Sequence, residues 1–414
     1  MPPDSTSPSK STTGWGPGLL VAATGVGAGD LIAAAVAGKA FGVSVLWVVI
    51  VGAVLKGLLN EGIARWQLAT GTSVISGWRE QLPRWISWYF GGYLVIWGFL
   101  VAGALGSASG VAFKSLWPDA PGSVGIWAVI HALVGWAIVR WGRFAIFEKA
   151  MRVLIAIMFI VVLVCGWQLM PSGGEMLRGL LWPTMPAGGL WLLLGLMGGV
   201  GGSATMLCYG YWMRERGWEG TAVLQGARKD LVAAYGLTAL FGVAMIIIAA
   251  GAQPDDASGT ALVVALSDRL GELFGAWGRL AFLTGFWCAV FSSLIGVWQG
   301  VPYLFADWWQ GIFKSETKAE ADAQSSSYRW FLIFLAGPPL TLQVFDRPLL
   351  VVVIYAVAGA FFMPLLAGTL LVMNNRTKAV GSLKNSRWVN AGLLLSLLLF
   401  GVLFVVEVFN RLTL

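Results

Sequence analysis

Long apolar runs, separated by short polar clusters, occupy most of the chain after its first dozen residues. Most of these runs approach the roughly 20 residues that a helix needs to cross the hydrocarbon core of a bilayer. The second run is the least regular, because it contains Lys56, Glu61 and Arg65. The pattern predicts eleven membrane-spanning helices, near 15–38, 43–69, 86–113, 122–141, 148–170, 188–213, 229–251, 276–310, 328–345, 348–373 and 388–410.

Composition supports a membrane protein that lies in a lipid bilayer. Hydrophobic residues make up 57% of the chain and charged residues 11%, whereas charged residues make up roughly 25% of a soluble domain. The basic residues that give the net charge of +7 lie between apolar runs, so they indicate membrane topology and not nucleic-acid binding. The sequence contains no phosphate loop, zinc-ligand spacing or catalytic triad pattern, which argues against an enzyme, a bound cofactor and ATP-driven transport.

The distribution of lysine and arginine predicts the topology. These residues concentrate in alternate loops, on the same side as the N-terminus, and positive loops stay in the cytoplasm. We therefore expect a bacterial plasma-membrane protein with a cytoplasmic N-terminus and, after eleven spans, an external C-terminus. Residues 1–13, rich in proline, serine and threonine, are predicted to be disordered; residues 14–375 are expected to form the membrane-embedded core, and residues 376–414 the eleventh helix and the C-terminus.

A glycine-rich pattern occurs twice, each time in the middle of a predicted span. Residues 25–29 read Gly-Val-Gly-Ala-Gly in span one, and residues 199–203 read Gly-Val-Gly-Gly-Ser in span six. Each glycine costs about 1 kcal/mol relative to alanine inside a helix. The glycines could simply allow close helix contacts. Their repetition favours a different interpretation, in which both helices are broken at matching positions and form a substrate site at the bilayer midplane.

The spacing of the two patterns predicts the architecture. They lie five spans apart, so the two halves of the chain have opposite orientations in the membrane. This predicts an all-α fold with a five-plus-five inverted repeat and an extra eleventh helix. Repeat one covers about 15–170 and repeat two about 188–373. Such a fold is typical of a secondary transporter that uses ion gradients and alternating access.

Several short segments resemble Nramp-type metal-ion transporters. The resemblance covers about 15–375, and it implies the LeuT-like fold of the APC superfamily and transport of a small solute or ion. The segments are Gly16-Pro17-Gly18-Leu19-Leu20-Val21 and Gly38 through Gly42 for span one, Leu68-Ala69-Thr70-Gly71 for span two, Ser292-Ser293 with Gly296 and Gly300 for span eight, and Pro364-Leu365-Leu366 with Asn374-Asn375 for span ten.

The same comparison reveals departures from that family at the expected site. Nramp transporters use Asp-Pro-Gly-Asn in span one, whose Asp and Asn bind metal, but this chain has Gly-Ala-Gly-Asp at residues 27–30. In span six the family has a metal-binding Met in a Met-Pro-His segment, whereas residues 201–205 read Gly-Gly-Ser-Ala-Thr. Acidic residues that the family uses for proton transfer in span three have no counterpart in residues 85–113. The resemblance therefore implies an Nramp-like branch with a rebuilt site.

Asp30, beside the first break, is the leading candidate for a substrate or metal ligand. It could instead cap the half-helix that follows, or do both. Hydroxyls and freed carbonyls near it would complete a set of hard oxygen donors that suits Mg²⁺, Mn²⁺ or Na⁺. The further candidate residues of this set are Thr24, Gly27, Ala28, Gly29, Gly201, Gly202, Ser203 and Thr205.

Two other functions remain open from the residues alone. A glycine-lined break beside one carboxylate leaves room for a small organic solute such as an amine, with Tyr209, Trp287 and Phe291 as walls. These aromatic residues could equally well pack between helices or face lipid. A receptor or scaffold that transports nothing is the third class. Glu61 and Arg65 lie four residues apart, so we expect a structural ion pair or an inner gate.

Overall fold

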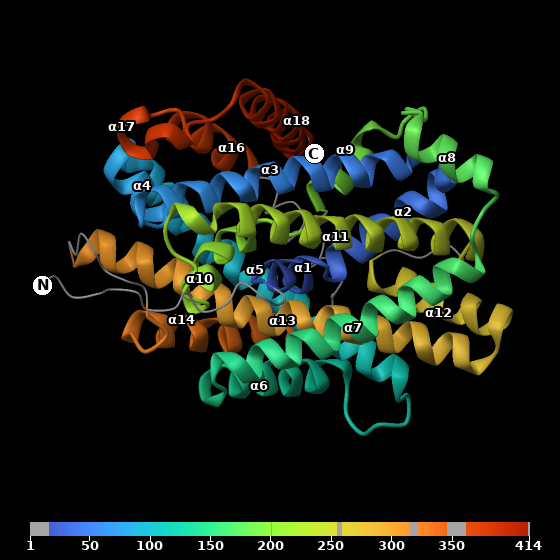
Figure 1. Ribbon diagram of the computed structural model, residues 1–414. Coiled ribbons are helices and arrows are strands. Elements are labelled where there is room, and N and C mark those ends of the chain that lie inside the picture. The colour runs from blue at the N-terminus through green and yellow to red at the C-terminus, as the bar shows by residue number, and fades with distance from the viewer. Residues whose placement is uncertain (1–15, 200, 255–258, 315–321, 346–361, 413–414) are drawn as a thin grey trace, which may run out of the picture.

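The computed structural model describes residues 16–199, 201–254, 259–314, 322–345 and 362–412. The segment predicted to be disordered, residues 1–13, lies outside the described residues. Helices form the secondary structure of the described chain (Figure 1), as the apolar runs predict. Seven helical segments within the described residues are long and apolar enough to cross a membrane.

The helices of the first half closely follow the predicted spans. A short 3₁₀ turn, Gly42–Val45, joins the second and third of them. In chain order they are α1 (Gly18–Gly25), α2 (Ala28–Phe41), α3 (Leu46–Thr70), α4 (Val74–Gln81), α5 (Arg84–Leu116), α6 (Val124–Trp141), α7 (Phe144–Gln168) and α8 (Gly173–Leu181).

The second half begins with another interrupted span, in which the 3₁₀ turn η2 (Ala204–Leu207) joins two short helices. The α-helices are α9 (Leu190–Gly199), α10 (Cys208–Glu215), α11 (Leu224–Ala252), α12 (Thr260–Phe274), α13 (Ala276–Phe313), α14 (Ser326–Ala336), α16 (Phe362–Met373), α17 (Thr377–Val380) and α18 (Arg387–Leu412). The remaining 3₁₀ segments are η3 (Thr221–Val223), η4 (Pro338–Phe345) and η5 (Gly381–Leu383).

Both predicted helix breaks are present. Helix α1 ends at Gly25, and α2 begins two residues later, at Ala28. Helix α9 ends at Gly199, and Gly201 and Gly202 both have φ of +79°, in the left-handed region that glycine adopts without strain. The glycines are therefore required by the backbone of the second break.

Two predicted spans differ from the structure or lie beyond it. The expected helix near 328–345 is interrupted, because α14 ends at Ala336 and the following Gly-Pro-Pro sequence leads into the 3₁₀ segment η4. Proline lacks the N–H group that would continue the helix. Most of the expected span at 348–373 lies outside the described residues, and only its end, α16, is seen. Helix α12 is additional, since its charged residues kept it out of the predicted spans.

Long helices lie side by side around the first interrupted span. Helices α3, α7, α11 and α13 run alongside one another across Figure 1, with α4, α10 and α17 at one end and α8 and α12 at the other. Helix α1 packs against α11 and α13, and α2 packs against α9 and α11. Both breaks therefore lie inside the helix assembly.

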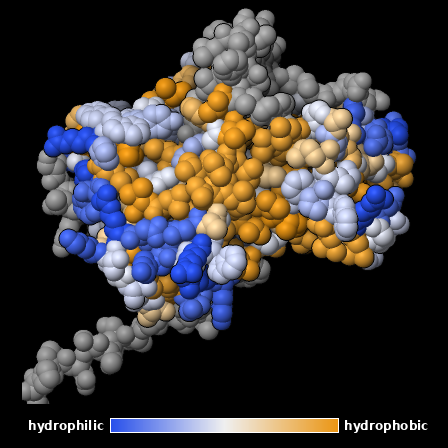
Figure 2. All heavy atoms as spheres, turned by 90° about the horizontal axis from the view of Figure 1, so that it is seen from above, coloured by the Kyte–Doolittle hydropathy of each residue, from blue (hydrophilic) through white to orange (hydrophobic). Residues whose placement is uncertain are grey.

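The surface has the pattern of a membrane protein. Figure 2 shows a broad apolar band with hydrophilic residues gathered at both ends of the molecule. Large exposed side chains on helices α6 and α7 include Ile130, Leu133, Ile160 and Val164. Contact of such apolar side chains with hydrocarbon is favourable, whereas their contact with water costs free energy.

Candidate substrate site at the two helix breaks

The two helix breaks touch each other. A Cβ atom at Gly25 would lie 2.7 Å from the carbonyl carbon of Gly201, and one at Gly202 would lie 3.3 Å from the Cα atom of Gly25. A side chain at Gly25 would therefore collide with the backbone of the second break. The glycines therefore allow close contact between helices, as one interpretation expects, and they also lie at helix breaks, as the other expects.

Asp30 links the two breaks. It lies in the first turn of α2, and its carboxylate Oδ2 accepts a hydrogen bond of 2.9 Å from the backbone N–H of Gly201. Gly27 occupies the N-cap position of α2, and no side chain caps that helix end. A negative charge on Asp30, in the first turn of α2, is still favourable at the N-terminal end of that helix. The main contact of Asp30 is thus with the other interrupted span.

Lys56 also contacts the second break. Its side chain on α3 is fully buried, and its Nζ donates to the carbonyl oxygens of Gly198, at 2.6 Å, and of Gly202. The Asp30 carboxylate contacts the residue next to Gly202 in the same segment, Gly201. The Asp30 carboxylate accepts a hydrogen bond from one backbone N–H of the break, and the Lys56 ammonium donates to two backbone carbonyls there. Two side chains of opposite charge therefore hold the unwound segment.

Lys56 is the main residue that sequence reasoning missed. It counted only as a reason to doubt the second span, although a lysine inside an apolar helix signals a function or a partner. Asn60, one turn later and also fully buried, donates to the Tyr235 hydroxyl at 3.1 Å. The Tyr235 ring lies against the break, because a Cβ atom at Gly201 would be 2.9 Å from it. Helices α3 and α11 thus enclose the second break.

The first break is held by neutral groups instead. On α13, Ser292 Oγ donates to the Ala23 carbonyl at 3.0 Å, and Ser293 Oγ donates to the Thr24 carbonyl at 2.9 Å. Both carbonyls belong to the last turn of α1, where a helix has unsatisfied acceptors. The two breaks therefore use different chemistry, hydroxyls at the first and an ammonium at the second.

Hydroxyl groups without partners lie close to the breaks. Thr24 Oγ1 and Ser203 Oγ are buried and form no hydrogen bond with the described protein groups. Thr205 is also buried, and its Oγ1 would lie 2.5 Å from a Cβ atom at Gly202. An unsatisfied buried hydroxyl costs about 1–3 kcal/mol, so each is a candidate ligand for a bound species.

The proposed aromatic walls have partners of their own. Tyr209 is fully buried, and its hydroxyl donates to the Asp230 carboxylate at 3.0 Å. Trp287 and Phe291 stack at 5.4 Å between ring centroids, and the indole N–H of Trp287 donates to His131 at 2.8 Å. These contacts fit the packing interpretation of the three residues.

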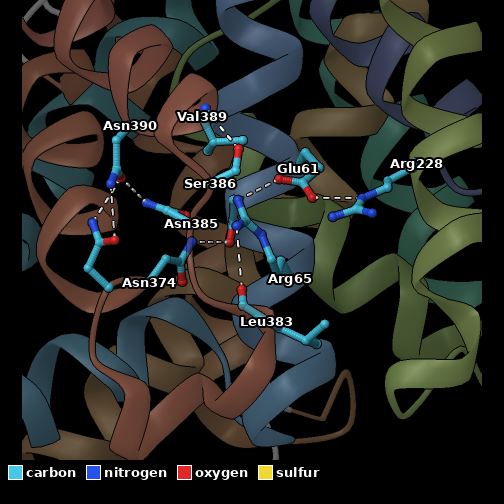
Figure 3. A network of polar contacts seen from close by, with 11 residues as sticks. Glu61, Arg65, Arg228, Asn374, Leu383, Asn385, Ser386, Val389 and Asn390 are labelled. Carbon is cyan, nitrogen blue, oxygen red and sulfur yellow. Dashed lines mark hydrogen bonds and ion pairs between the residues drawn. The ribbon is translucent and has the colours of Figure 1, made fainter.

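Glu61 and Arg65 belong to a polar network near the start of α18 (Figure 3). The Glu61 carboxylate pairs with Arg65 at 2.7 Å and with Arg228 of α11 at 2.9 Å. Asn374, at the end of α16, donates to the Gly62 carbonyl at 2.9 Å. The network joins α3, α11 and the end of α16, and its contacts are distinct from those of Asp30 and Lys56.

Two further carboxylates, one partly buried and one buried, lie at element junctions that sequence reasoning passed over. Asp230 accepts from the Gly18 N–H at 2.6 Å, and so holds the first turn of α1 against α11. Asp307 on α13 accepts from the Tyr211 hydroxyl at 2.6 Å and from Ser76 at 3.2 Å. Helix α1 and helix α10 are both fixed by carboxylates at the same end of the molecule as α4.

The polar donors identified at the crossing are oxygen atoms. Among the described residues, no group of three or more histidine, cysteine, aspartate or glutamate residues could hold a metal ion. The available donors are the Asp30 carboxylate, the Thr24 and Ser203 hydroxyls and backbone carbonyls. Such oxygen donors suit hard cations.

Sequence and structure comparisons place the chain in a family. The family model described as "Nramp: Natural resistance-associated macrophage protein-like" matches residues 18–410. No curated protein sequence matches the chain. A solved structure of a manganese transporter from Eremococcus coleocola matches with a TM-score of 0.73 and 15% sequence identity, covering 98% of this chain and 88% of that one.

Transporters of other families match as well. MhsT in complex with L-phenylalanine has a TM-score of 0.58 and 17% identity, with 94% of this chain and 98% of that chain covered. A nucleobase-cation-symport-1 family transporter, in a closed conformation with bromovinylhydantoin bound, has a TM-score of 0.60 and 15% identity, with 94% of this chain and 91% of that chain covered. At these identities the likeness shows the shared fold alone, the LeuT-like fold. The chain belongs to the Nramp family, and it is a helical integral membrane protein of the secondary-transporter class.

Proposed function

We propose that this transporter moves a hard cation, with Mg²⁺ or Mn²⁺ as the leading substrates, through the crossing of the two helix breaks. The observation that carries the proposal is the Asp30 carboxylate at the point where the breaks meet, hydrogen-bonded to Gly201. The unpartnered hydroxyls of Thr24 and Ser203 supply further oxygen donors. Hard divalent cations prefer this kind of ligand set, completed by water.

Alternating access requires the crossing to open in turn to each side of the membrane. The first turn of α1 is held by Asp230, which also accepts a hydrogen bond from Tyr209. Release of substrate toward the end of the molecule where α4 and α10 lie therefore needs these contacts to separate. We expect that end to be cytoplasmic, since lysine and arginine concentrate in the loops there. Accessibility of tags at the two termini in intact cells tests the orientation, and both tags on one side would refute the eleven-span count.

Uptake into proteoliposomes tests the substrate directly. We expect vesicles with the wild-type protein to take up Mg²⁺ or Mn²⁺, reported by an enclosed cation-sensitive dye, and Asp30→Asn to abolish this uptake. Asp119→Asn is the matched control, because it removes the same charge from an exposed loop. Wild-type uptake no faster than that of empty vesicles would overturn the proposal.

One observation favours a second candidate, a small organic amine. The second break already holds a primary ammonium, that of Lys56, on two backbone carbonyls. A free alkylamine has the same donor chemistry and could take its place. Uptake of a radiolabelled short alkylamine that depends on Asp30 and is not inhibited by Mg²⁺ or Mn²⁺ would favour this candidate over the cation.

A further inference from the structure

We propose that the Lys56 ammonium is a resident cation in the carbonyl site of the second helix break, which the substrate cation must displace and which returns when the substrate leaves. The inference rests on the proposed function and deepens it. Lys56 then determines how tightly the site holds a substrate, and it keeps the empty transporter electrically balanced.

The geometry of the second break is the first argument. Unwinding between α9 and α10 exposes carbonyl oxygens, and exposed carbonyls at a broken membrane helix attract cations. The Lys56 Nζ donates to the carbonyls of Gly198 and Gly202, on the two sides of the interruption. An ammonium in contact with both carbonyls occupies the place where a bare cation would bind.

The comparison between the breaks is the second argument. At the first break, Ser292 and Ser293 satisfy the freed carbonyls with neutral hydroxyls. Neutral donors are thus sufficient to satisfy the carbonyls of a broken helix in this chain. A buried charge in the membrane is expensive, so its use at the second break indicates a role that a hydroxyl cannot fill.

The third argument is charge balance. Asp30 and Lys56 contact neighbouring residues of the same unwound segment, so the empty site brings one acidic and one basic group together. When a divalent cation reaches Asp30, the ammonium repels it, and withdrawal of Lys56 removes that repulsion. After the substrate leaves, the ammonium returns to the carbonyls of Gly198 and Gly202 near Asp30, and the empty carrier reorients without an unpaired charge in the membrane.

This account predicts opposite effects of one substitution on binding and on net transport. In Lys56→Gln the repulsion is gone, so purified protein titrated with Mg²⁺ or Mn²⁺ in a calorimeter should bind at least about ten-fold more tightly than the wild type. Net uptake into cation-free vesicles should fall at least about ten-fold, because the empty site now holds an unpaired carboxylate. Exchange of external for internal cation in preloaded vesicles needs no empty reorientation and should continue.

Two further variants separate this role from a structural one. Lys56→Arg keeps the charge, so we expect no tightening of Mg²⁺ or Mn²⁺ binding. Ser293→Ala removes a neutral donor from the first break without changing any charge, so it too should leave cation binding no tighter. A loss of net uptake and exchange together in Lys56→Gln, with binding unchanged or weaker, would mean that Lys56 only supports the fold.

The outcomes also distinguish this inference from the proposed function. If the wild type transports the cations but Lys56→Gln binds them no more tightly, the inference is wrong and the function stands. If the wild type transports neither cation but Lys56→Gln binds one, the resident cation is supported and cation transport is refuted. If neither protein binds either cation, both proposals fail.

Discussion

The charge pair at the crossing leads to a quantitative prediction for stability. Asp30→Asn keeps an oxygen that can accept the hydrogen bond from Gly201 but removes the negative charge. Lys56, which is fully buried and donates to Gly202 in the same segment, then loses the acidic group that contacts the neighbouring residue Gly201. Removing one partner of a buried pair typically destabilises a protein by about 3–5 kcal/mol, because the other charge stays buried and uncompensated.

A double-mutant cycle isolates the pair. We expect Asp30→Asn and Lys56→Met each to lower the free energy of unfolding by about 3–5 kcal/mol. The double variant leaves neither charge unpaired, so its loss should be smaller than the sum of the single losses by about 2–3 kcal/mol. Unfolding in mixed detergent micelles that contain a chelator gives the four values. Additive losses within about 0.5 kcal/mol would refute the coupling of the two residues.

Three further predictions follow from other contacts. Gly25→Ala should abolish transport and lower the yield of folded protein, because the new Cβ atom would lie 2.7 Å from the backbone of Gly201. The yield after detergent extraction and the uptake into vesicles measure these two effects, and normal uptake would contradict the close contact of the breaks. Glu61→Ala should cost about 3–5 kcal/mol, since Arg65 stays buried without its partner, and the same micelle unfolding assay would show an unchanged stability if the pair were dispensable. Asp230→Asn should weaken the hold on α1 and raise the labelling rate of a cysteine introduced at the crossing from that end of the molecule; an unchanged rate would exclude this contact as a gate.

The sequence could predict the broken helices because their signal is local. Glycines at residues 25–29 and 199–203 interrupt otherwise apolar runs, and each cluster disfavours a continuous helix by itself. The same logic located Asp30, the ionisable residue next to the first cluster. Family resemblance then agreed with the repeat and with the fold that the comparisons show.

The partner of the second break could not be predicted in the same way. Lys56 is far from residues 198–202 in the chain, and its contact depends on how α3 packs against α9. No local pattern tells which carbonyl a lysine will reach. The hydropathy pattern also gave a wrong prediction for the helix near 328–345. The apolar residues continue past Pro338, whereas the α-helix ends before it.

A Mn²⁺ anomalous difference map of protein crystals soaked in this ion tests the central claim most directly. The account predicts a peak between residues 27–30 and 201–203, within coordination distance of the Asp30 carboxylate, with the Lys56 side chain withdrawn from the carbonyls of Gly198 and Gly202. A map without a peak there, at Mn²⁺ concentrations that support uptake, or a peak at the crossing with Lys56 still bound to both carbonyls, would contradict it.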